Sequence, residues 1–200
     1  MQKRPRLDKG MEASGDSLEV GRYFLGIPIP GKLRTKLARI QDTLDSNVGF
    51  RWVPPQNLHI TLRFLGKMET KTTTTLVEQL HHRLKLPSFF ISLGGLGAFP
   101  SPQRSRVIWL GVLEGNQQLC ELETTLQPVL SATGFEPPVQ PFKPHITLAR
   151  LRRPTNLTSM LDAHCSEHYS FQVDQFLLYR SHLGHGPARY EICAEFGLTP

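Results

Sequence analysis

The sequence predicts an α+β fold in which two pseudo-symmetric lobes face one central cleft. The first observation is a repeat, because His-Ile-Thr-Leu occurs at residues 59–62 and again at residues 145–148, an offset of 86 residues. The second is that the same offset relates strand-like and helix-like patterns ahead of each copy. The third is a proline-containing loop before each copy. A pseudo-two-fold axis between such halves would bring two equivalent strands face to face.

The elements follow in the same order in both halves. Residues 22–27 read as a strand, and the offset places residues 108–113 in the equivalent position. A strand-like segment at 89–93 after the first motif corresponds in the same way to 175–179. Between strand and loop, each half has a helix whose apolar residues share one face at 3.6-residue spacing. These residues are Leu33, Leu37, Ile40 and Leu44 in the first half, and Leu119, Leu126 and Leu130 in the second.

The extent of the repeat predicts the domain organisation. Residues 20–198 are expected to form a single bilobal domain whose repeat halves lie at about 21–106 and 107–192. Residues 1–19 are polar and charged and lack the apolar stretch of a signal peptide. We therefore expect them to form a disordered N-terminal tail.

Composition and charge restrict the class of protein. The 200 residues include 39% hydrophobic and 20% charged residues, which predicts a packed globule. The net charge of +6 favours partners that carry phosphate. Three cysteines without a C-x-x-C pair argue against a disulfide framework or a zinc ribbon, and fit reduced thiols in the cytoplasm. No apolar run approaches the roughly 20 residues that span a bilayer, so no membrane partner is expected.

Strand alternation predicts which motif side chains point the same way. In the first motif, His59, Thr61 and Arg63 fall on one face, opposite the apolar side chains of Ile60, Leu62 and Phe64 that should form core. The second motif places His145 and Thr147 on one face, and this split should hold through Ala149. Arg150 breaks the alternation, so we expect it at the strand end, where it could bend back toward an anion.

The residue types indicate metal-free chemistry at a phosphate. Imidazole titrates near pH 6.5, so one histidine can be neutral while the other is protonated. The hydroxyls of Thr61 and Thr147 can donate hydrogen bonds to phosphate oxygens, and the guanidinium groups of Arg63 and Arg150 can bind their charge. A zinc hydrolase is the alternative, but no Cys, Asp or Glu lies beside either histidine and the arginines would repel a cation.

These segments resemble the RNA 2′,3′-cyclic phosphodiesterases, once called 2′-5′ RNA ligases, of the two-histidine phosphoesterase superfamily. The resemblance covers roughly residues 20–196. The segments that carry it are RYFLGIP at 22–28, NLHITLRFLG at 57–66, PFKPHITLAR at 141–150 and SHLGHGPARY at 181–190. It implies the bilobal two-histidine phosphoesterase fold, with antiparallel sheets and with both motifs lining the central cleft.

The resemblance also implies an activity, namely hydrolysis of RNA 2′,3′-cyclic phosphate termini to 2′-phosphomonoesters, with reversible 2′-5′ ligation as a side capacity. It makes His59 the proton donor and His145 the proton acceptor, although two such similar motifs leave the reverse assignment open. It implies no cofactor and a substrate among tRNA fragments or oligoribonucleotides. Separately, we expect a monomer in the cytoplasm. Two alternatives remain: a two-histidine esterase of small cyclic nucleotides, and a non-catalytic module that binds RNA or nucleotides.

Overall fold

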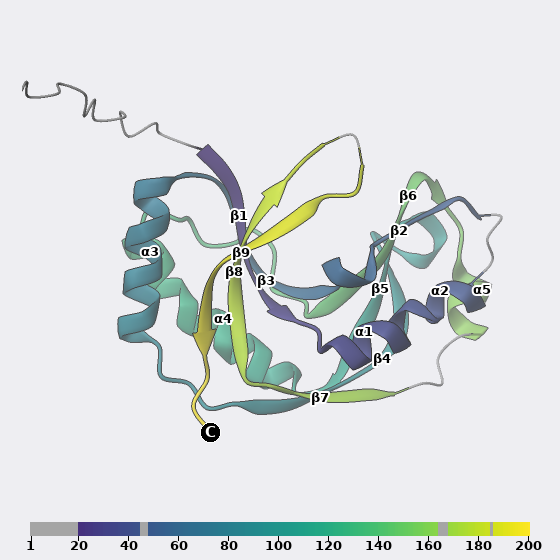
Figure 1. Ribbon diagram of the computed structural model, residues 1–200. Coiled ribbons are helices and arrows are strands. Elements are labelled where there is room, and N and C mark those ends of the chain that lie inside the picture. Colours follow the sequence, from purple (N-terminus) through teal and green to yellow (C-terminus); the bar gives the residue numbers. More distant parts are fainter. Residues whose placement is uncertain (1–19, 45–47, 164–167, 185) are drawn as a thin grey trace, which may run out of the picture.

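The computed structural model describes residues 20–44, 48–163, 168–184 and 186–200 (Figure 1). The tail predicted at residues 1–19 lies outside this part of the chain. The elements in chain order are β1 (Val20–Pro28), α1 (Gly31–Ala38), α2 (Ile40–Thr43), β2 (Phe50–Trp52), β3 (His59–Glu69), α3 (Thr70–Arg83), β4 (Phe89–Phe99), β5 (Ser105–Glu114), α4 (Asn116–Ala132), β6 (His145–Thr155), α5 (Thr158–Ala163), β7 (Tyr169–Val173), β8 (Gln175–His182) and β9 (Arg189–Gly197).

The strands of the described chain form one antiparallel sheet in the order β7-β4-β5-β6-β3-β1-β8-β9, with β2 added to β6. The two motif strands, β3 and β6, meet at its centre through one residue pair, Ile60 and Ile146. These two residues are equivalent in the sequence repeat, and an antiparallel pair of equivalent residues lies on a local two-fold axis. The predicted α+β fold, with pseudo-symmetric lobes and antiparallel strands, is therefore confirmed.

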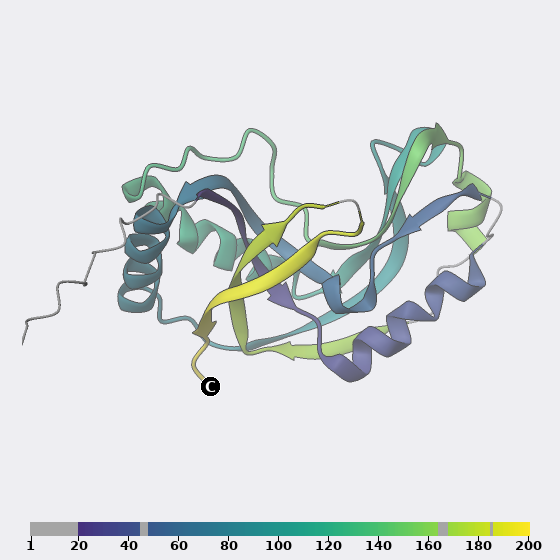
Figure 2. The same ribbon diagram turned by 45° about the horizontal axis from the view of Figure 1, so that its top comes forward.

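Each half of the sequence contributes one strand to the lobe that the other half mainly forms. Strand β4 pairs with β5 of the second half, whereas β8 pairs with β1 of the first half. In Figures 1 and 2, α3 and α4 lie beside the lobe of β1, β3 and β8, and α1, α2 and α5 lie beside the lobe of β4, β5 and β6. Each lobe is consequently built from both halves of the sequence.

The sheet register differs from the predicted offset of 86 residues for β1 and β5, the first strands of the two halves. Gly26 lies opposite Thr61, and Trp109 lies opposite Thr147, so the spatial equivalents in β1 and β5 are 83 residues apart and not 86. Backbone pairing fixes this register, whereas the offset of 86 aligns the strands with the helices that follow them. The helix predicted over 33–44 is also interrupted, because α1 ends at Ala38 and α2 begins at Ile40.

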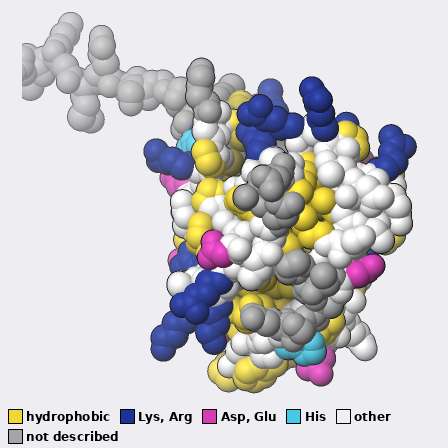
Figure 3. Space-filling view, turned by 90° about the vertical axis from the view of Figure 1, so that its right-hand side faces the viewer, with side chains coloured by type: hydrophobic (Ala, Val, Ile, Leu, Met, Phe, Trp, Pro, Cys, Tyr) yellow, Lys and Arg dark blue, Asp and Glu magenta, His cyan; other side chains and the backbone are white. Residues whose placement is uncertain are grey.

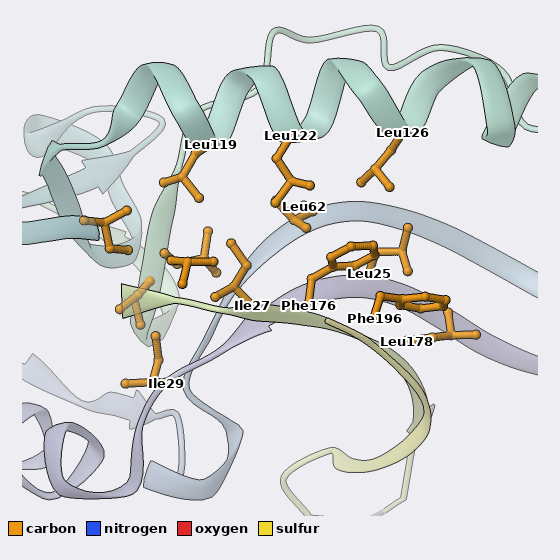
Figure 4. Close-up of a cluster of buried hydrophobic side chains, with 14 of the residues drawn as sticks. Leu25, Ile27, Ile29, Leu62, Leu119, Leu122, Leu126, Phe176, Leu178 and Phe196 are labelled. Carbon is orange, nitrogen blue, oxygen red and sulfur yellow. The ribbon is translucent and has the colours of Figure 1, made fainter. Parts of the chain in front are cut away.

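The main core lies between α4 and the sheet. Leu119, Leu122 and Leu126 project from one face of α4 toward the sheet, where Leu62 and Phe176 are also fully or almost fully buried (Figure 4). Burying each such side chain contributes about 1.5–3 kcal/mol. This packing fixes the back of β3 and so positions the motif side chains on its other face. Among the described helices, none is long and apolar enough to cross a membrane.

Candidate active site

A β-bulge interrupts each motif strand at an equivalent residue. In β3, Thr61 lies opposite Gly26 and Arg63 lies opposite Leu25, so that Leu62 has no partner in the ladder. In β6, Leu148 is skipped in the same way, between partners of Thr147 and Ala149. A bulge adds one residue to the strand and reverses the alternation of the side chains beyond it.

The bulges make two face predictions wrong. Beyond Leu62, Arg63 turns inward and is 8% exposed, while Phe64 turns outward and is 71% exposed. Beyond Leu148, Ala149 is fully buried and Arg150 is exposed on the side of the cleft. Arg150 therefore owes its direction to the bulge and not to a strand end, since β6 continues to Thr155.

One cleft of about 1130 Å³ receives both motifs. In the antiparallel register set by Ile60 and Ile146, His59 takes the position beside Thr147, and His145 the position beside Thr61. All four of these side chains line the cleft, together with Arg150. Arg63 lines the same cleft, so the structure brings together all six site residues predicted from the sequence.

Both imidazole rings are held in the same manner. Nδ1 of His59 donates to the carbonyl oxygen of Asn57 at 2.6 Å, and Nδ1 of His145 donates to the carbonyl oxygen of Lys143 at 2.6 Å. A carbonyl can only accept, so these contacts place a proton on Nδ1 and leave Nε2 to exchange protons. The Thr61 hydroxyl lies 3.0 Å from Nε2 of His59.

Burial and charge lower the pKa of both histidines. Desolvation is the largest cause at His59; the charges of His145 and Arg150 add to it, the hydrogen bond to Asn57 opposes it, and the pKa falls to about 4. Desolvation likewise lowers the pKa of His145, with further contributions from Lys143 and Arg150. These surroundings favour two neutral rings. An anion bound between the rings would favour protonation of one of them.

Aromatic rings surround each histidine. Phe24 lies 4.8 Å from the His59 ring, and Tyr190 meets that ring edge-on at 5.4 Å. Phe99 meets the His145 ring edge-on at 5.0 Å. The sequence predicts no role in the site for Phe64 or Phe99, because a ring in an apolar strand has the same pattern as a core residue. Only the register and the bulges place these rings in the cleft.

Arg63, the sixth predicted site residue, lines the cleft but is engaged there by other groups. Its guanidinium lies 3.6 Å from the Glu123 carboxylate and donates to the carbonyl oxygen of Glu136. Gln127 donates to the same carboxylate. These contacts tie β3 to α4 and to the proline-containing loop that follows it. In the described part of the chain, no three His, Cys, Asp or Glu side chains come together as a metal site would require.

Comparison with known proteins gives consistent matches. The chain matches the family described as LigT like Phosphoesterase at residues 27–109 and again at residues 110–188. An RNA 2′,3′-cyclic phosphodiesterase of Aeropyrum pernix is 38% identical over 127 residues, 63% of this chain and 72% of that protein. The protein of the same name from Escherichia coli (strain K12) is 30% identical over 181 residues, 90% of this chain and 98% of that protein.

Solved structures agree with the sequence comparison. The crystal structure of E. coli LigT complexed with 3′-AMP superimposes with a TM-score of 0.75 at 28% identity, covering 91% of this chain and all of that chain. A crystal structure of the Thermus thermophilus protein TT0787 superimposes with a TM-score of 0.74 at 27% identity, covering 88% of this chain and 97% of that chain. Since the family match extends over both motifs and both lobes, the chain belongs to the LigT-like phosphoesterase family.

Proposed function

We propose that this protein hydrolyses RNA 2′,3′-cyclic phosphate termini to 2′-phosphomonoesters, with His59 and His145 as the acid–base pair. The observation that carries the proposal is the arrangement of the two rings. Each is anchored by Nδ1 to a backbone carbonyl two residues earlier in the chain, and both line one cleft. The names of the relatives from A. pernix and E. coli support the same reaction.

The reaction balances with these groups alone. His145 takes a proton from water, and the water oxygen attacks phosphorus. The bond between phosphorus and the 3′ oxygen breaks, and protonated His59 gives that oxygen its proton. The hydroxyls of Thr61 and Thr147 and the guanidinium of Arg150 stabilise charge on the non-bridging oxygens. If a 5′-hydroxyl replaces water, the same steps give a 2′-5′ linkage, so we include ligation in the proposal.

The negative charge of a bound substrate raises the pKa of His59 and so favours its protonated form. Without a bound anion, burial first and then the positive charges of His145 and Arg150 lower the pKa of His59 to about 4. A bound phosphate monoanion offsets those positive charges and therefore raises the pKa of the nearby imidazole. We assign Arg63 no phosphate contact, because Glu123 and the Glu136 carbonyl already engage its guanidinium.

The direct test is product analysis on a short RNA that ends in a 2′,3′-cyclic phosphate, with EDTA in excess. We expect a 2′-phosphate product, and a loss on the order of a hundredfold or more in H59A and H145A. H82A, which changes an exposed histidine of α3, is the matched control and should keep full activity. Turnover that survives in both site variants would refute the assignment.

A substrate that needs no acid separates the roles of the two histidines. The p-nitrophenolate of a p-nitrophenyl phosphodiester departs without protonation. If His59 is the donor, H59A should lose far less activity on this substrate than on the cyclic phosphate, whereas H145A should lose the same on both. The opposite pattern would reverse the two roles.

The proposal extends to a monomer in the cytoplasm. Both motifs come from one chain and line one cleft, so the proposed site needs no residue from a second copy. The described cysteines, Cys120 and Cys193, are free thiols, as expected in a reducing compartment. Light scattering coupled to gel filtration would test whether the protein is a monomer, because it measures the molar mass and a stable dimer would have twice the mass of one chain.

A further inference from the structure

A pair of exposed arginines extends the cleft along the lobe of β2 and β6. Arg51 of β2 lies directly opposite Arg150 of β6 in the antiparallel register. Opposed residues of paired strands project to the same face, so Arg51 shares the face of Arg150, which lines the cleft. On the other side of β6, Val107 lies opposite Arg150 and also lines the cleft. Arg51 thus lies one strand beyond the cleft wall.

Arg152 adds exposed positive charge two residues further along β6. Leu151, between Arg150 and Arg152, is 7% exposed and packs in the core of this lobe, and the pairing of β6 with β5 is irregular beyond Arg150. Arg152 itself is exposed. Two residues of strand advance about 7 Å, which is comparable to the step between successive phosphates of an extended RNA strand. We call Arg51 and Arg152 the arginine rim.

Salt bridges within the described part of the chain do not account for the positive charge of the rim. The salt bridges of the described residues include none of Arg51, Arg150 and Arg152. Like charges directly opposite each other on neighbouring strands destabilise a sheet, so the facing pair Arg51 and Arg150 carries a folding cost. Figure 3, which shows this side of the molecule, has Lys and Arg side chains gathered along its upper margin. The concentrated positive charge calls for an anionic partner.

We infer that the arginine rim binds the phosphodiester backbone of the nucleotides preceding the cyclic end, so that the preferred substrate is an oligoribonucleotide and not a cyclic mononucleotide. The inference rests on the proposed function and specifies its substrate. Arg150 contacts the reacting phosphate inside the cleft, and the rim contacts the next phosphates outside it. A cyclic mononucleotide can enter the cleft but has no second phosphate to place on the rim.

The test compares two double variants of equal charge on two substrates. R51Q/R152Q removes the rim. R22Q/K67Q is the matched control, because Arg22 and Lys67 are also exposed cations opposite each other on paired strands, but they lie on the lobe of β1 and β3. The substrates are a 2′,3′-cyclic mononucleotide and an oligoribonucleotide with a cyclic phosphate end. The oligoribonucleotide has about ten residues, which is long enough to extend from the cleft over the rim.

For the oligoribonucleotide, R51Q/R152Q should raise KM about tenfold and leave kcat unchanged, since two exposed ionic contacts are lost. The slope of log KM against log salt should become shallower by about 1.4, from about 0.7 for each lost phosphate contact. Hydrolysis of the mononucleotide should stay at the wild-type rate. The control R22Q/K67Q should match wild type on both substrates.

Equal effects of the two variants, or no effect of R51Q/R152Q on the oligoribonucleotide, would overturn the inference. Failure of the proposed function gives a different result, namely wild-type protein that hydrolyses neither substrate. In that event, fluorescence anisotropy with a labelled oligoribonucleotide still tests the rim. R51Q/R152Q should then weaken binding about tenfold relative to R22Q/K67Q, and equal affinities would refute it.

Discussion

Burial of His59 makes the folded protein sensitive to acid over a defined pH range. The pKa of its imidazole is about 4 in the folded state, with desolvation as the main cause, and about 6.5 in an unfolded chain. Because the folded pKa is depressed, the unfolded state binds more protons between these values. The free energy of unfolding therefore falls as pH falls from 6.5 toward 4. Integration from pH 7 to pH 4.5 gives a loss of about 2 kcal/mol from this one group.

The perturbation is H59Q, which keeps a polar side chain but cannot titrate. Urea unfolding at a series of pH values should give a curve that falls about 2 kcal/mol less between pH 7 and pH 4.5 than the wild-type curve. The slope of the unfolding free energy against pH is the informative quantity, because packing lost in H59Q shifts its whole curve by a constant amount. H82Q, at an exposed histidine of α3, shows what removal of a histidine outside the site does. Parallel curves for wild type and H59Q would refute the reasoning.

Four further predictions concern the site. Because both histidines have lowered pKa values, the profile of kcat/KM against pH should peak below pH 6.5, and a peak at pH 8 would contradict this. A Cβ at Gly26 would lie 3.0 Å from the carbonyl oxygen of Ile60 and 3.3 Å from Cδ2 of His59, so G26A should displace this segment and lower kcat on the order of tenfold without unfolding the protein; an unchanged kcat would show that the ring tolerates the shift. R63M leaves Glu123 buried without its cation and should cost about 3 kcal/mol in urea unfolding, part of which R63M/E123L should restore; additive losses would argue against the pair. R150Q should lower kcat/KM on the order of a hundredfold and raise the pKa of both histidines, which NMR titration of the imidazole protons would measure, and unshifted titrations would place Arg150 away from them.

The corrections share one physical cause. Strand alternation is a valid rule only while every residue is paired, and a bulge reverses it from one residue onward. The sequence around Leu62 and Leu148 carries no glycine or proline that would mark a bulge. Alternation therefore predicts Phe64 in the core, whereas the structure leaves it 71% exposed, and Arg63 and Phe64 both line the cleft.

The amino-acid sequence by itself determined the α+β class, the duplication, and the equivalence of His59 with His145 and of Thr61 with Thr147 in the repeat. It could do so because a repeated motif at a constant offset is a local property that needs no coordinates. Only the tertiary structure decided the exchange of β4 and β8 between lobes, the register of β1 and β5, the partners of Arg63 and the direction of Arg150. These depend on hydrogen-bond pairing between distant segments and on one extra residue per strand, and neither leaves a periodic trace in the chain.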